Sequence, residues 1–212
     1  MAQASRERGA KAVANAREAR GLARRETILM AALDEFSARG FEATRLDDVA
    51  KRAGIAKGTI YLYFRDKETL FQELVRAMLA PLIAGMEAMR EADLPPGKLS
   101  EILLDMFVRE IYETRRKEVI RLIITEGRRF PKLAEFYYRE VLSRIFEAVR
   151  ALLKRASAHS PVPEALIEFP QLVASPALLA IIWNGLFDRY EPLDVRKMLK
   201  AHIDLMLPKG AP

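Results

Sequence analysis

The sequence of 212 residues contains no cysteine and only two histidines. Without cysteine there are no disulfide bonds, thiolate zinc sites or cysteine nucleophiles, and such a composition is typical of a reducing compartment. His159 and His202 have no neighbouring ligands at metal spacing, so we predict neither a metal site nor a cofactor. The chain also lacks G-x-S-x-G, glycine-rich phosphate-loop and H-E-x-x-H patterns, and we therefore expect no enzyme.

Long hydrophobic runs and strand patterns are also missing. No apolar run reaches the roughly 18 residues that cross a bilayer, and the N-terminal residues lack the apolar segment of a secretory signal. We expect a cytoplasmic protein with no membrane partner. Helical spacing without alternating strand patterns or hairpin turns predicts an all-α fold.

The net charge of +6 is distributed unevenly along the chain. Residues 1–67 contain 14 Lys/Arg against 9 Asp/Glu, whereas residues 68–212 contain 21 against 20. A basic N-terminal region joined to a nearly neutral remainder indicates a polyanionic partner such as nucleic acid. The alternative is a basic tail that serves only solubility.

The most informative stretch, residues 41–71, reads FEATRLDDVAKRAGIAKGTIYLYFRDKETLF. It contains two short helical patterns, at about 45–52 and from Lys57 to Phe64. Between them Gly54 is expected to adopt the left-handed conformation that other residues avoid. This is the layout of a helix-turn-helix, which places its second helix in a DNA major groove.

The neighbouring elements complete a small N-terminal domain. Residues 1–21 are expected to form a mobile basic arm, followed by a helix over about 22–39. Thr44 and Asp47 have the spacing of a capping box for the next helix, and Asp66 can cap a fourth helix.

The remainder of the chain is expected to form further helices. Pro81 should kink the fourth helix because proline removes one backbone hydrogen bond, and residues 94–97 form a break. Ser175 and Pro176 suit a helix start. The later helices are expected at about 98–115, 117–127, 131–157, 163–174, 176–189 and 193–206.

Residues 28–74 resemble the DNA-binding domain of the TetR (tetracycline-repressor) family of bacterial regulators. The matching residues are Ile28, Ala31, Phe36, Gly40, Phe41, Thr44, Val49, Ala50, Ala53, Gly54, Lys57, Gly58, Tyr61, Tyr63, Phe64, Lys67 and Leu70. The resemblance implies an all-α protein of about nine helices. A three-helix helix-turn-helix domain over 22–67 would precede a ligand-binding and dimerisation domain over 68–212.

The resemblance also implies which residues contact DNA. Thr44 and Arg45 would meet a phosphate at the start of the second helix. Base contacts would come from the start of the recognition helix, and Tyr63 and Lys67 would hold phosphates. The residues for base contacts are Lys57, Gly58, Thr59 and Tyr61. The family often has a serine cap where this chain has Ala56, which puts one cap and one phosphate contact in doubt.

Two tyrosines and the basic arm allow more than one interpretation. Tyr61 and Tyr63 cannot share one helix face, so we expect Ile60 and Phe64 to be buried and both tyrosines to be partly exposed. The arm could follow DNA or be an ordinary solvated tail. Its basic residues are Arg6, Arg8, Lys11, Arg17, Arg20, Arg24 and Arg25.

The C-terminal helices predict a homodimer that binds a palindromic operator. Residues 176–187 are apolar on almost every side, which indicates contact with a second chain. Similar regulators pair through their last two helices, here about 176–189 and 193–206, where Leu193, Met198, Leu199, Ile203 and Leu207 would contribute. A two-fold dimer matches half-sites about 34 Å apart or a multiple of that distance.

The resemblance finally implies an unknown apolar effector in a cavity of the C-terminal domain, although ordinary core packing is the alternative for each residue. The candidate lining residues are Met78, Leu82, Met86, Leu103, Phe107, Ile111, Phe136, Tyr137 and Trp183. The effector would shift the helix that contains Pro81 and lift repression. A non-specific nucleic-acid-binding protein that acts through its basic arm is the alternative function.

Overall fold

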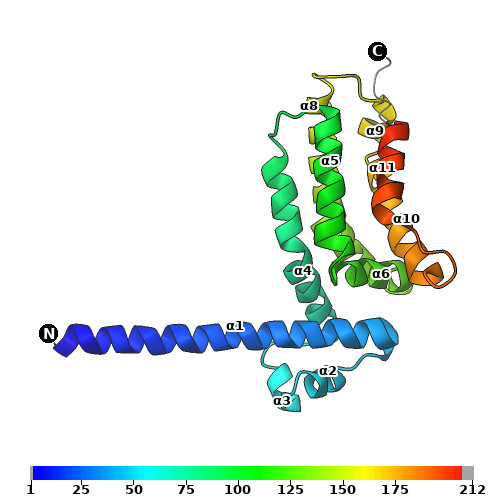
Figure 1. Cartoon of the computed structure of the whole chain (residues 1–212). Helices are drawn as coiled ribbons and strands as arrows, with labels where there is room; N and C mark the ends of the chain where they lie inside the picture. Colours follow the sequence, from blue (N-terminus) through cyan, green and yellow to red (C-terminus); the bar gives the residue numbers. More distant parts are fainter. Residues whose placement is uncertain (1, 207–212) are drawn as a thin grey trace. The chain divides into compact units, whose positions relative to one another are not determined.

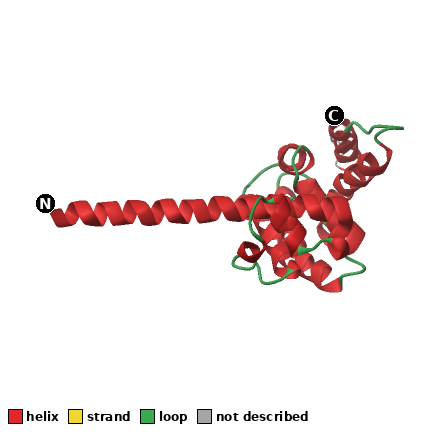
Figure 2. Ribbon diagram, turned by 90° about the horizontal axis from the view of Figure 1, so that it is seen from below, coloured by secondary structure: helices red, strands yellow, loops and turns green. Residues whose placement is uncertain are grey.

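The computed structural model describes the backbone of residues 2–206 and the side chains of residues 15–206. Helices and connecting loops account for all of this part, in which no strand occurs (Figure 1, Figure 2). The all-α prediction is therefore confirmed. The chain forms two compact units that divide between Leu74 and Val75, inside a helix rather than at residue 67, where the sequence suggested a boundary.

The first unit is built from α1 (Ala2–Ala43), α2 (Leu46–Arg52), α3 (Lys57–Ile60) and the start of α4 (Lys67–Met89). α1 begins far earlier than residue 22, so the start predicted for the first helix is wrong, and the backbone of the predicted arm is helical from Ala2. The arm is rich in alanine, arginine and glutamate, which are all good helix formers. Its helix extends beyond α2 and α3 (Figure 1).

Gly40 interrupts α1 near its end, with φ 77° and ψ 172°. This left-handed φ suits glycine, and it turns the chain toward α2. The Thr44 hydroxyl then donates to the Gly40 carbonyl at 2.7 Å. The predicted capping box is wrong, because Arg45 is the N-cap of α2 and no side chain caps it.

Three phenylalanines form the centre of the first unit. Phe36, Phe41 and Phe71 have ring centroids 5.5 to 6.0 Å apart, and each is at most 1% exposed. Leu70 and Leu74 are fully buried too. The first turns of α4 thus supply core residues to the first unit, which explains why the division falls after Leu74.

The second unit contains the rest of α4 and a further set of helical segments. They are α5 (Pro96–Met106), η1 (Phe107–Tyr112), α6 (Arg116–Glu126), α7 (Pro131–Tyr137), η2 (Tyr138–Leu142), α8 (Ser143–Ala156), α9 (Glu164–Glu168), α10 (Gln171–Phe187) and α11 (Val195–Met206). The segments η1 and η2 are π-helical. Pro131 occupies the start of α7, as predicted.

The predicted helix start at Ser175 and Pro176 is wrong, because α10 begins at Gln171 and runs through Pro176. A proline inside a helix leaves the carbonyl four residues earlier without its usual N–H donor. Here that carbonyl belongs to Leu172, and it accepts hydrogen bonds from Ser175 Oγ at 2.9 Å and from His202 Nε2 at 3.2 Å. These replacement donors explain why the helix tolerates the proline.

Buried residues of α4, α5, α8 and α9 form the main core of the second unit, with Met86, Leu99, Leu152 and Leu166 among them. By length and composition alone, α4 is apolar enough to cross a bilayer. However, 44% of that stretch is buried inside the protein, as in the core helix of a folded domain.

Candidate functional site

The turn between α2 and α3 has the geometry that the sequence predicted. Gly54 has φ 67°, in the left-handed region, and Ile55 N–H closes the turn on the Ala50 carbonyl at 3.0 Å. α3 begins at Lys57 but ends at Ile60, so the predicted helix up to Phe64 is too long. After Ile60 the chain tightens through i→i+3 bonds, such as Tyr63 N–H to the Ile60 carbonyl at 3.0 Å.

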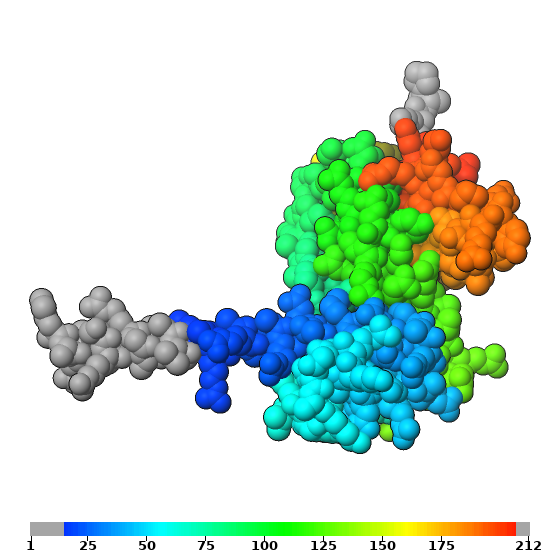
Figure 3. Space-filling view, turned by 60° about the horizontal axis from the view of Figure 1, so that its bottom comes forward, coloured from blue at the N-terminus to red at the C-terminus, as the bar shows by residue number. Residues whose placement is uncertain are grey.

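Two buried residues hold this segment on the first unit. Ile60 and Phe64 are 0% and 1% exposed, as expected from their spacing. The side chains of Lys57 and Tyr61 are 70% and 49% exposed, and Leu62, which follows Tyr61, is exposed as well. The segment forms part of the open surface of the first unit (cyan in Figure 3).

Asp47 of α2 contacts two of the predicted DNA-binding side chains, those of Lys57 and Tyr61. Its carboxylate accepts from Lys57 Nζ at 2.7 Å and from the Tyr61 hydroxyl at 3.5 Å. The hydrogen bond and charge of Asp47 raise the pKa of Lys57 above its ordinary value. Sequence reasoning missed Asp47 in this role, because the contact depends on how the turn folds α3 back beside α2.

The other predicted DNA-binding residues have differing environments. Lys67 donates to the Glu42 carbonyl at 2.8 Å and lies 4.7 Å from the centroid of the Phe41 ring, so its ammonium is already oriented. Tyr63 is half-buried beside Phe64. Gly58 is exposed, and a Cβ placed on it would meet nothing within 4 Å. Thr59 is half-buried.

The start of α2 does not present Thr44 as expected. The Thr44 side chain is 2% exposed and its hydroxyl is bonded to Gly40, so it has a structural position rather than an accessible one. Arg45 beside it is exposed, and its carbonyl accepts the N–H groups of Asp48 and Val49 at the start of α2.

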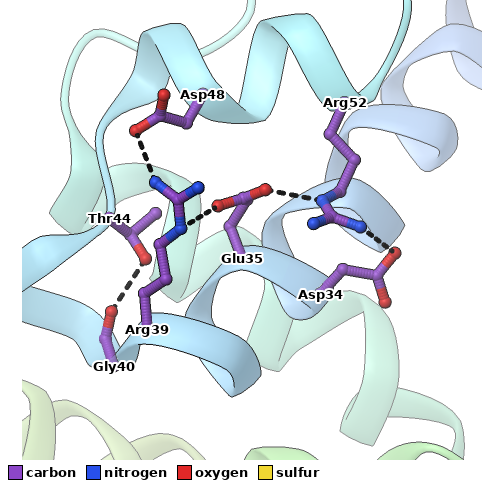
Figure 4. A network of polar contacts seen from close by, with 7 residues as sticks. All are labelled: Asp34, Glu35, Arg39, Gly40, Thr44, Asp48 and Arg52. Carbon is purple, nitrogen blue, oxygen red and sulfur yellow. Dashed lines mark hydrogen bonds and ion pairs between the residues drawn. The ribbon is translucent and has the colours of Figure 1, made fainter.

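A buried carboxylate joins α1 to α2 behind this surface (Figure 4). Glu35 is 3% exposed, accepts a hydrogen bond from Arg52 Nε at 2.6 Å and forms an ion pair with Arg39 Nε at 3.3 Å. Arg39 also contacts Asp48 at 3.4 Å, and Arg52 contacts Asp34 at 3.8 Å. This alternating chain of charges links α2, and therefore the turn after it, to the long α1.

The seven basic residues of the predicted arm divide into three groups. Arg17, Arg20 and Arg24 are exposed. Arg25 is paired with Glu73 and lies 5.7 Å from the Phe64 ring centroid, so it belongs to the folded core of the first unit. The side chains of the remaining candidates, Arg6, Arg8 and Lys11, lie outside the described residues.

The second unit encloses a cavity of about 190 Å³. Five of the nine predicted residues line it, namely Leu82, Met86, Leu103, Phe107 and Ile111. Further lining residues come from α8, α9, α10 and α11. Only Ser100 and His202 bring polar side chains to the cavity, and no charged residue among those that the structure describes lines it.

The other four predicted residues do not line this cavity. Met78 contributes its backbone carbonyl to Arg116 Nε at 2.7 Å, and Phe136 lies under the Arg76 guanidinium. Burial of Tyr137 raises the pKa of its phenol far above the usual value. Trp183 donates from Nε1 to the Glu191 carbonyl at 2.7 Å, outside the cavity lining.

One face of α10 is apolar and exposed. Leu178, Ile182 and Leu186 follow one another every four positions, and Leu172 and Leu179 are seven apart, so all five share one side of the helix. Each of them is 37–63% exposed. The expected contribution of residues 193–206 differs, because Leu199 and Ile203 line the cavity while Leu193 and Met198 are partly buried against the core of the second unit. Leu207 lies outside the described residues.

Comparison with known proteins agrees with this architecture. The tetR family of bacterial regulatory proteins matches residues 28–74, which contain the helix-turn-helix. The C-terminal domain of AefR-like transcriptional repressors matches residues 98–160. The chain belongs to the TetR family. Among the residues that the structure describes, no cluster of side chains suited to a metal ion is found.

Individual relatives of this TetR-family chain cover different shares of it. The regulator RutR of Escherichia coli K12 is 32% identical over 121 residues, which are 57% of this chain and 49% of RutR. The match thus spans about half the length of that relative. The solved structure of SmeT from Stenotrophomonas maltophilia in its triclosan complex has a TM-score of 0.70 at 18% identity, covering 87% of this chain and 90% of that one. FadR of Bacillus subtilis in complex with stearoyl-CoA has a TM-score of 0.67 at 20% identity, covering 86% and 97%. At these identities the two structures are similar in fold.

Proposed function

We propose that this TetR-family protein is a homodimeric, sequence-specific DNA-binding repressor that is released by an apolar small molecule. The observation that carries this proposal is the open surface around α3. Lys57, Gly58 and Tyr61 are exposed there, while Ile60 and Phe64 fix the segment to the core beneath it. A short helix presented in this way can enter a major groove and meet base edges.

The roles of the surface residues follow from their contacts. Lys57 and Tyr61 both contact Asp47, and from these positions they would meet base edges. Tyr63 and Lys67 lie beyond them and would contact phosphates. Arg45 would meet a phosphate at the start of α2, whereas buried Thr44 would position that start through its bond to Gly40.

The exposed apolar face of α10 supports the homodimer. Large apolar residues that share one helix face and remain open to solvent usually mark an interaction site. Pairing of this face with the same face of a second copy would give the two-fold symmetry of a palindromic operator. Because Val195 and Leu199 of α11 are buried in the second unit and Leu199 and Ile203 line its cavity, we assign the larger share of this interface to α10.

The cavity supports release by a ligand. α4 contributes Leu82 and Met86 to the cavity lining and Leu70, Phe71 and Leu74 to the core of the first unit. A ligand with unequal affinity for two positions of this helix would shift the equilibrium between them. SmeT in complex with triclosan and FadR in complex with stearoyl-CoA are examples of proteins of this fold that bind a ligand.

The alternative function, non-specific binding through the basic arm, makes a different prediction in a gel-shift experiment. The DNA would be the promoter next to the protein's own gene, with unrelated DNA as competitor. One variant is Lys57→Ala, and its matched partner replaces Arg17, Arg20 and Arg24 with glutamine on the exposed part of α1.

The repressor hypothesis predicts that Lys57→Ala relaxes the preference at one base pair, whereas the arm variant still selects its own promoter over the competitor. If unrelated DNA displaces the promoter from the protein, and only the arm variant loses promoter binding, the result would support the non-specific alternative instead.

A further inference from the structure

The cavity of the second unit has only two polar side chains among its described lining residues. Each of them already donates a hydrogen bond to a backbone carbonyl. Ser100 Oγ donates to the Pro96 carbonyl at 2.8 Å. His202 Nε2 lies 3.2 Å from the Leu172 carbonyl, and since a carbonyl oxygen only accepts, Nε2 carries the hydrogen. Each group can still accept a hydrogen bond from a ligand. Ser100 would accept through Oγ, and the neutral ring of His202 would accept through Nδ1.

The orientation of His202 follows from the proline in α10. Pro176 has no N–H, so the Leu172 carbonyl lacks its usual helical partner and is free to accept from the imidazole. This bond fixes the tautomer and position of the ring, as a hydrogen bond to one nitrogen generally does. The proline from which the sequence predicts a helix start therefore has a consequence for the ligand site.

The lining also limits charge and size. No lysine, arginine, aspartate or glutamate of the described residues lines the cavity, so with a neutral His202 a charged ligand would be buried without an oppositely charged partner, at high cost. An apolar cavity of roughly 150 Å³ accommodates benzene. A cavity of about 190 Å³ therefore suits a molecule slightly larger than one aromatic ring.

From these observations we propose that the cavity binds a small, uncharged, mostly apolar molecule with one hydroxyl or N–H donor, which donates to His202 Nδ1 or Ser100 Oγ. The inference rests on the proposed function, in which this cavity holds the effector. It adds the ligand class: a donor group is favoured, and carboxylates and other anions are excluded.

The test is isothermal titration calorimetry of the full-length protein without DNA, using three probes of similar size. The probes are 4-propylphenol, which has a donor, 4-propylanisole, which lacks it, and 4-propylbenzoate, which is charged. We expect 4-propylphenol to bind about fivefold more tightly than 4-propylanisole, the effect of one net hydrogen bond. We expect no binding of 4-propylbenzoate at concentrations about a hundredfold above the dissociation constant of 4-propylphenol.

Variants identify the acceptor. His202→Leu or Ser100→Ala, whichever side chain receives the bond, should reduce the preference for the phenol over the anisole to about twofold or less while the anisole still binds. His159→Leu is the matched control, because His159 pairs with Asp93 at 2.6 Å and does not line the cavity. This variant should retain the full preference.

Equal binding of phenol and anisole by the wild-type protein, tight binding of the benzoate, or no binding of any probe would each overturn the proposed ligand class. These outcomes are independent of folding in the variants, since the wild-type series alone decides them. A failure of the proposed ligand class can also be told apart from a failure of the proposed function, because operator binding by the ligand-free protein is measured without any probe.

Discussion

Replacing Gly58 by alanine separates the stability of α3 from its contact with DNA. Gly58 is helical and exposed, and a Cβ there would meet nothing within 4 Å of the protein. Alanine at a helical position is favoured over glycine by roughly 0.5–1 kcal/mol. The free energy of unfolding should therefore stay equal or rise by up to about 1 kcal/mol, as measured by urea denaturation.

The same methyl group should weaken DNA binding. If α3 lies in the major groove with Gly58 against the DNA, the added carbon overpacks a close contact, which costs roughly 1–3 kcal/mol. Operator affinity, measured by fluorescence anisotropy at constant salt, should then fall about 5- to 100-fold. The loss would occur in a protein that is at least as stable as the wild type.

Gly85→Ala is the matched control for this experiment. Gly85 lies in α4 and is exposed, and a Cβ added to it would also have no neighbour within 4 Å. It should give the same gain in stability with unchanged operator affinity. If Gly58→Ala binds the operator as tightly as Gly85→Ala does, α3 does not approach DNA as proposed and the reasoning fails.

Three further predictions concern charged residues. Lys67→Ala should weaken binding to every sequence and lower the slope of log affinity against log salt by roughly one, in a titration over salt concentration. Asp47→Asn removes the carboxylate that holds Lys57, so competition assays should show stronger binding to random DNA and a lower ratio of operator to random affinity. Asp66 caps α4 by accepting the Thr69 N–H at 2.7 Å, and hydrogen bonds from the side chain and the backbone of Thr69 lower the pKa of Asp66 below its usual value. A carboxyl group whose pKa is lowered by folding stabilises the fold at pH values above its unfolded-state pKa. Asp66→Ala should therefore lower the free energy of unfolding by about 1 kcal/mol at neutral pH. That difference should shrink as the pH falls through the folded-state pKa, and thermal unfolding at several pH values, with Asp66→Asn as the isosteric control, checks it.

Local patterns were sufficient to predict much of the first unit. Glycine at the left-handed turn position, apolar residues four apart and an aspartate cap each have a local physical cause, and Gly54, Phe64 and Asp66 have the structures that those causes predict. The ion pair between Lys57 and Asp47 could not be predicted in this way, since it joins two helices across a turn.

Predictions failed where tertiary contacts override local preference. Pro176 was expected to begin a helix, yet α10 continues through it because Ser175 and His202 supply donors to the freed Leu172 carbonyl. Trp183 was expected at the cavity, but the loop after α10 turns back and the Glu191 carbonyl accepts its indole N–H. Helical spacing gives the face of a residue only relative to its own helix, and the neighbour of that face depends on packing.

The most direct test of the central claim is selection of bound sequences from random DNA by the full-length protein, followed by measurement of the protein-to-DNA stoichiometry. The proposed function predicts an enriched inverted repeat, with half-site centres about 34 Å apart or a multiple of that distance, bound by two chains. Enrichment of no sequence, or of a single half-site bound by one chain, would contradict it.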